Sequence, residues 1–163
     1  GWIMFKSGLH IVLLGAFLAV TGVAQAQEKA DGKSLPVDTR HLVVAAKTAV
    51  IAVNQANLTN NYSVLRELAA PGFRDKNSAK DLEKIFAKLR ESNLDFSPIL
   101  VYNPKFADTA IMPNGLLRLR GYFPTQPLQV HFDLLFQPVG GEWRLYALRV
   151  APAKEEESAS KLR

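Results

Sequence analysis

The spacing of apolar residues changes once along the chain, from a helical period to the period of two that marks strands. Before residue 98 the apolar residues recur at intervals of three and four, which is the spacing of one helix face. After that point they alternate with polar residues, as in strands with one buried face. The pattern predicts an α+β fold, with N-terminal helices packed on a curved antiparallel sheet.

Three helices are predicted in the first half of the chain. The first has Asp38 or Thr39 as its cap, because both side chains can accept a hydrogen bond from the first turn. Pro71 stops the second helix, and Ser78 with Asp81 forms a capping box that begins the third. The predicted ranges are Asp38 to Asn57, Tyr62 to Ala70 and Ser78 to Asn93.

Four strands are predicted in the second half, separated by turn-forming residues. Pro113-Asn114-Gly115, Pro124 to Pro127 and Gly140-Gly141 mark the three turns. The predicted strands are Ile99 to Phe106, Leu116 to Phe123, Leu128 to Pro138 and Glu142 to Val150.

The turns also predict how the last three strands pair. If Phe123 pairs with Leu128, and Val139 with Glu142, one face becomes almost wholly apolar and meets the helices. This inner face would hold Leu117, Leu119, Phe132, Leu134, Phe136, Leu145, Ala147 and Arg149. The outer face would hold Leu116, Arg118, Arg120, His131, Asp133, Leu135, Tyr146, Leu148 and Val150. A slip of one residue would mix the two sets, which favours this register.

In that register Arg118 and Asp133 lie directly opposite each other on the outer face. An exposed ion pair, a dimer interface and a catalytic group are all compatible with this placement. An exposed cross-strand pair contributes at most about 1 kcal/mol. A homodimer interface would be formed by Arg118, Asp133, Tyr146 and Leu148, because apolar residues surround the pair.

Residues 1–26 have the layout of a secretory signal peptide. Lys6 precedes an apolar run, and Ala24-Gln25-Ala26 supplies small residues at the cleavage point. The alternative is an uncleaved membrane anchor, but the run is shorter than the roughly 20 residues that span a bilayer. We expect cleavage after Ala26, no stable membrane span afterwards, and a periplasmic or secreted protein. The remaining chain is divided into a linker at 27–37, one domain at 38–152 and a disordered charged tail at 153–163.

Composition narrows the classes of function. The chain has no cysteine, so no disulfide can form, and an exported protein of this kind is more typical of a bacterial periplasm. The net charge of +5 is scattered along the sequence, whereas nucleic-acid binding usually needs a concentrated basic patch. After cleavage only His41 and His131 remain, without metal-ligand spacing, and no cofactor-binding motif is present. We expect no metal, no cofactor and no nucleic-acid partner.

Two stretches resemble the nuclear-transport-factor-two-like superfamily, the cone-shaped fold that also hosts ketosteroid isomerase and polyketide cyclases. Residues Tyr62 to Arg74 look like the helix and loop before the pocket of that fold. Gly141-Glu-Trp-Arg-Leu-Tyr146 looks like the start of its last strand. The resemblance covers Asp38 to Pro152 and includes exported bacterial members without an assigned reaction. It implies a fold rather than an activity, because the fold hosts many functions.

The resemblance implies a pocket inside the cone, for which the candidate lining residues are Tyr62, Phe86, Leu119, Phe132 and Arg149. Isomerase-type members carry an aspartate base and acidic or tyrosine donors inside the cone. Here Asp133 and Tyr122 are predicted to point outward, which leaves Arg149 as the inward ionisable group. We therefore expect a non-catalytic binding or interaction module, for a small apolar ligand with an anionic end or for an envelope protein. The alternative is a small cofactor-independent lyase or isomerase, and no catalytic residue is assigned.

Overall fold

The computed structural model of the chain describes residue 35 and residues 37–155. The predicted signal peptide, most of the predicted linker and residues 156–163 of the predicted tail lie outside the described residues. Ala153, which was assigned to the tail, is instead the last residue of the final strand and pairs with Gln129.

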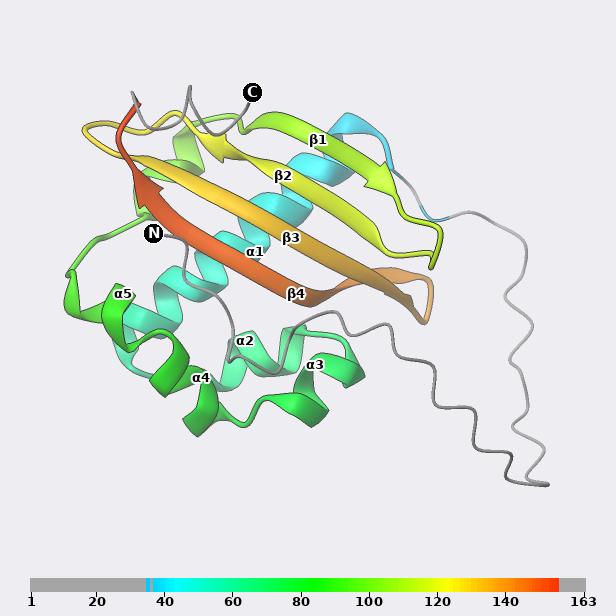
Figure 1. Cartoon of the computed structure of the whole chain (residues 1–163), viewed down its shortest axis with the longest axis horizontal. Coiled ribbons are helices and arrows are strands. Elements are labelled where there is room, and N and C mark those ends of the chain that lie inside the picture. The colour runs from blue at the N-terminus through cyan, green and yellow to red at the C-terminus, as the bar shows by residue number, and fades with distance from the viewer. Residues whose placement is uncertain (1–34, 36, 156–163) are drawn as a thin grey trace.

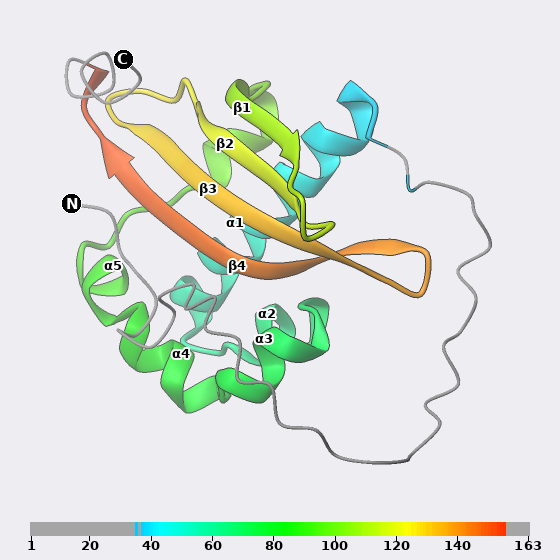
Figure 2. The same ribbon diagram turned by 45° about the vertical axis from the view of Figure 1, so that its right-hand side comes forward.

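Helices precede a four-stranded antiparallel meander, so the predicted α+β class and element order are confirmed. Figure 1 shows α1 crossing one face of the sheet, with the shorter helices gathered beyond β4. Figure 2 shows the same arrangement turned by 45° about the vertical axis. The helices are α1 (Thr39–Thr59), α2 (Ser63–Leu68), α3 (Pro71–Lys76), α4 (Ala79–Ile85), α5 (Ala87–Glu91) and the 3-10 helix η1 (Ser97–Val101). The strands, in their order across the sheet, are β1 (Lys105–Ile111), β2 (Leu117–Phe123), β3 (Gln129–Val139) and β4 (Glu142–Ala153).

Side-chain caps explain where the helices begin. An Asp38 oxygen accepts the backbone N–H of His41 at 3.0 Å, so Asp38 rather than Thr39 is the cap of α1. Ser78 and Asp81 form the predicted capping box at the start of α4. Pro71 ends the second predicted helix but also begins α3, since its fixed φ suits the first position of a helix. Phe86 divides the third predicted helix into α4 and α5.

The first predicted strand was placed too early. Ser97–Val101 forms η1, and β1 begins only at Lys105. The buried side chain of Asn54 on α1 sets this turn, because its oxygen accepts the N–H of Phe96 at 2.7 Å and its nitrogen donates to Asp95 and Ser97. A proline at the start of η1 suits a helical turn better than a paired strand.

The β2–β3 pairing differs from the predicted register by two residues. Phe123 pairs with Val130 rather than with Leu128, because the connecting loop is longer than a four-residue turn. Thr125 closes this loop with its N–H on the Phe123 carbonyl and its hydroxyl on the Leu128 carbonyl. An even shift leaves every side chain on its predicted face, so the inner set of β2 and β3 is unchanged.

The β3–β4 pairing begins as predicted, with Val139 opposite Glu142, but shifts by one residue after Leu145. Tyr146 is the extra residue of this β-bulge, and every later residue of β4 turns to the opposite face. Leu148 and Val150 therefore lie in the core, while Ala147 and Arg149 lie on the outer face, opposite to the prediction.

The bulge coincides with a contact between β4 and the helices. The N–H of Ala70, between α2 and α3, donates to the Leu145 carbonyl at 2.8 Å, and Ala69 forms a parallel bridge with Leu145. The ring of Tyr146 lies over α3, where a methyl group at Gly72 would come within 3.1 Å of it. The extra residue thus lets the Leu145 carbonyl reach the helical layer while the rest of β4 stays paired with β3.

The helices and the inner sheet face enclose one apolar core. The largest fully buried side chains are Tyr62, Phe73, Phe86, Phe123, Phe132, Leu65, Leu82, Ile99, Leu119, Leu134, Leu148 and Val50. Among the described residues, α1 is long and apolar enough to cross a membrane. Its packing against this core accounts for the same composition, so the finding is weak evidence for a span.

Candidate functional site

The five predicted pocket residues lie in two different environments. Tyr62, Phe86, Leu119 and Phe132 are fully buried in the core, and Arg149 is exposed on the outer face. The rings of Tyr62 and Phe86 stack with their centroids 5.9 Å apart. Phe132, by contrast, packs against Phe106 and Phe123 of the sheet. The structure therefore brings Tyr62 and Phe86 together and separates Arg149 from all four.

Tyr62 belongs to a buried polar network. Its hydroxyl donates to the Asn57 side chain at 2.6 Å and accepts from Arg90 at 2.8 Å. Burial raises the pKa of Tyr62, so the hydroxyl keeps its proton and serves as a donor. These contacts tie α1 and α2 to α5, which is a structural role.

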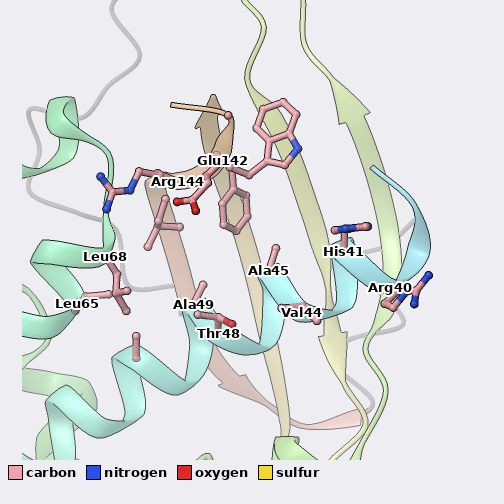
Figure 3. Close-up of a pocket in the computed structure, with 15 residues that line it drawn as sticks. Arg40, His41, Val44, Ala45, Thr48, Ala49, Leu65, Leu68, Glu142 and Arg144 are labelled. Atoms are coloured by element: carbon pink, nitrogen blue, oxygen red, sulfur yellow. The ribbon is translucent and has the colours of Figure 1, made fainter. Parts of the chain in front are cut away.

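An open groove of about 590 Å3 lies between α1 and the β3–β4 hairpin. Figure 3 shows Val44, Ala45, Thr48 and Ala49 along one wall, with the hairpin opposite and α2 at one end. The apolar side chains of the hairpin and of α2 that line it are Phe136, Trp143, Leu145, Leu65 and Leu68.

Small side chains on α1 create this groove. Ala45, Ala49 and Ala52 face the hairpin, and alanine leaves space where a larger residue would fill the gap. Five alanines lie between residues 45 and 56, a pattern that indicates close approach of another element. Only the folded chain shows that part of this run lines an open groove.

Charged residues border the groove. Arg40 and His41 come from the first turn of α1, while Glu142 and Arg144 come from β4 (Figure 3). The His41 ring lies 2.7 Å from a carboxylate oxygen of Asp38. Hydrogen bonds from the His41 backbone and ring lower the pKa of Asp38, so this carboxylate is ionised at neutral pH.

The outer sheet face carries a row of charged residues, and Leu135 and Ala147 lie beside it. Asp108, Arg120, Asp133 and Arg149 lie opposite one another across β1 to β4. Arg118 reaches Asp133 diagonally, with its Nε 3.0 Å from one carboxylate oxygen and a terminal nitrogen 2.7 Å from the other. The ion pair predicted from the sequence is present, although the two residues are not direct cross-strand neighbours.

Two members of the predicted interface are absent from that face. Leu148 is 2% exposed in the core, and Tyr146 packs on α3 with Lys76 over its ring. Both corrections follow from the single bulge, which moves the apolar residues of β4 inward. In the described part of the chain, no group of three His, Cys, Asp or Glu residues is arranged to hold a metal ion.

No family model, no curated protein and no solved structure matches this chain.

Proposed function

We propose that this chain is an exported binding module without a reaction of its own. Its ligand is an elongated molecule with an apolar body and an anionic end, held in the groove between α1 and the β3–β4 hairpin. The observation that carries this proposal is an apolar groove of about 590 Å3 bordered by two arginines. Sites for small molecules typically occupy about 300–1,000 Å3 and combine apolar walls with a few polar groups.

The shape and exposure of the groove favour an elongated apolar body. Its α1 wall extends from Arg40 to Ala52, which corresponds to about 18 Å at the rise of an α-helix. Val44 is 59% exposed and Leu68 is 46% exposed, so both offer apolar surface that a ligand would cover. Each 100 Å² of apolar surface removed from water stabilises a complex by about 2.5 kcal/mol before the costs of binding.

The charges favour an anionic end. Arg40 and Arg144 supply two guanidinium groups at the border of the groove, against the single carboxylate of Glu142 among its lining residues. Arginine donates in a fork that fits a carboxylate, so a fatty-acid-like head group suits this border.

Fold and location complete the proposal. The order of helices and antiparallel strands supports membership of the nuclear-transport-factor-two-like superfamily, and the layout of residues 1–26 supports export. A homodimer through the outer face stays a prediction. It is less favourable than the sequence implied, because two copies of an arginine-bearing face would repel each other.

A calorimetric titration with laurate tests whether the groove binds such a ligand. We expect Thr48→Trp to weaken laurate binding at least about tenfold, since an indole would fill the groove. Gln55→Trp, an exposed position on α1 outside the groove, is the matched control. Arg144→Gln should weaken laurate binding but leave dodecanol binding unchanged. Absence of laurate binding, or equal binding by Thr48→Trp and the wild type, would contradict the proposal.

The paired Asp38 and His41 favour a second candidate, a cofactor-independent lyase or isomerase. A carboxylate that orients an imidazole is the arrangement of a general base, and this pair lies at the border of an apolar groove. A long-chain ketone in D2O should then exchange its α-protons faster with the wild type than with His41→Gln. Equal exchange rates would leave the binding module as the better proposal.

A further inference from the structure

We propose that Arg120 and Arg149 form a binding site for a phosphate group on the outer face of the sheet. This face is turned toward the viewer in Figure 1, away from α1. The site is independent of the groove, since the two lie on opposite sides of the sheet.

The first observation is the division of charge around Asp133. Arg120 on β2 and Arg149 on β4 are its direct cross-strand neighbours. Both oxygens of Asp133 nevertheless accept hydrogen bonds from Arg118. Arg118 and Asp133 therefore neutralise each other, and neither neighbouring guanidinium forms an ion pair with this carboxylate.

The second observation is an unsatisfied donor. The Nε of Arg120 is buried and has no hydrogen-bond partner in the described part of the chain. A buried donor without a partner is costly, and such atoms in native structures call for a functional or structural explanation. A phosphate oxygen that displaces the atoms covering this N–H and accepts from it would remove the cost. Asp108 lies opposite Arg120 on β1 but forms no ion pair or hydrogen bond with it.

The arrangement of the two arginines favours phosphate over carboxylate. Neighbouring strands lie about 4.8 Å apart, so β2 and β4 place Arg120 and Arg149 about 10 Å apart on either side of β3. The two long side chains can approach one ligand from two directions. A planar carboxylate is matched by one guanidinium, whereas a tetrahedral phosphate has oxygens for both. The ligand is a phosphate group, either free or in a lipid headgroup.

A titration with inorganic phosphate, monitored by NMR, tests the site directly. In wild-type protein at pH 7.5 and fixed ionic strength, inorganic phosphate should shift the side-chain Nε–H signal of Arg120. That signal is assigned by its loss in Arg120→Lys. Arg149→Gln should bind phosphate about tenfold more weakly than the wild type, because it loses charge-assisted hydrogen bonds. Lys88→Gln, which removes one exposed positive charge from α5, should bind like the wild type.

Vesicle binding separates the two sources of phosphate. Phosphatidate vesicles, compared with phosphatidylcholine vesicles, present the group as a headgroup. Binding to phosphatidate alone that is lost in Arg149→Gln supports the site with a lipid as its source. The proposal is overturned if the protein binds neither phosphate nor phosphatidate vesicles. It is also overturned if Arg149→Gln and the wild type bind equally well. Unchanged phosphate affinity in Arg120→Lys also overturns the proposal, because the Nε donor of Arg120 would then be unnecessary for binding.

Discussion

Asp95 helps to hold the turn between the helical layer and the sheet. One of its oxygens accepts the hydroxyl of Ser97 at 2.6 Å, the N–H of Ser97 at 2.9 Å and the side-chain amide of Asn54 at 2.9 Å. These hydrogen bonds, led by that of the Ser97 hydroxyl, lower the pKa of Asp95 below its ordinary value of 3.8. The folded state therefore favours the ionised carboxylate.

The lowered pKa predicts how stability depends on pH. A carboxyl whose pKa is lower in the folded state stabilises the fold above its unfolded pKa. That contribution is lost as the pH falls through the folded pKa. The stability difference between the wild type and Asp95→Asn should be constant from neutral pH down to about 5 and shrink below 3.8. Urea unfolding across this range measures the difference, with Asp75→Asn as an exposed control. A difference that does not vary with pH would contradict the role given to the charge.

Asp133 should matter more than an ordinary surface carboxylate. Its side chain is 18% exposed and accepts two hydrogen bonds from Arg118. Asp133→Asn should therefore lower the free energy of unfolding by about 1.5–3 kcal/mol, above the 1 kcal/mol expected for an exposed pair. Glu67→Gln is the matched control, because Glu67 pairs with Arg66 and Arg74 but is 61% exposed. Equal losses for the two variants in urea melts would place Asp133 in the exposed class.

At the level of elements, the bulge at Tyr146 decides which residues of β4 are core. Deleting Tyr146 would remove the extra residue, so β3 and β4 could pair without a break while Leu148 and Val150 stay in the core and Arg149 stays on the outer face. The deletion should still destabilise the fold, because an unbroken strand would no longer direct the Leu145 carbonyl to the N–H of Ala70, and the ring on α3 is lost as well. Tyr146→Ala keeps the residue count and loses only the ring, so it should cost about 1–3 kcal/mol. The deletion should cost more than Tyr146→Ala, and a deletion variant as stable as Tyr146→Ala in urea melts would show that the bulge is not needed for the contact between β4 and the helices.

The same element shows where sequence reasoning reaches its limit. Alternation and turn residues predict the number and order of the strands and the faces of β2 and β3. The bulge leaves no such signal, because it depends on a hydrogen bond from Ala70, far away in the sequence. Arg149 and Leu148 were therefore assigned to the wrong faces, and the candidate pocket and interface included them. The proline at the start of η1 is a local signal for a helical turn, although the alternation of the residues after it is typical of a strand.

The groove belongs to the scale of the whole molecule. Its walls come from α1, α2 and the β3–β4 hairpin, which meet only in the fold. Periodicity predicts which residues are buried, but a groove arises where packing is incomplete. Leu119 and Phe132, two of the predicted pocket residues on the inner rows of the sheet, belong to the apolar core.

Export is a further prediction for the whole chain. Cleavage after Ala26 should leave Gln27 as the N-terminus of the protein in a periplasmic fraction, because Ala24 and Ala26 fit the small-residue cleavage pattern. Mass spectrometry of that fraction measures the N-terminus. Ala26→Phe should block processing and serves as the control. An intact N-terminal segment recovered with membranes would indicate an anchor.

The contact between Ala70 and Leu145 also bears on aggregation. Strands at the edge of a sheet can template pairing with another chain, and unbroken edges are the most hazardous. The β4 edge is interrupted where the Leu145 carbonyl bonds to Ala70, and β1 has its own irregularity between Phe106 and Asp108. Endless stacking of copies needs two continuous edges on each molecule, and this domain offers a broken one on either side. A sheet of only four strands can therefore keep two open edges without growing into fibrils.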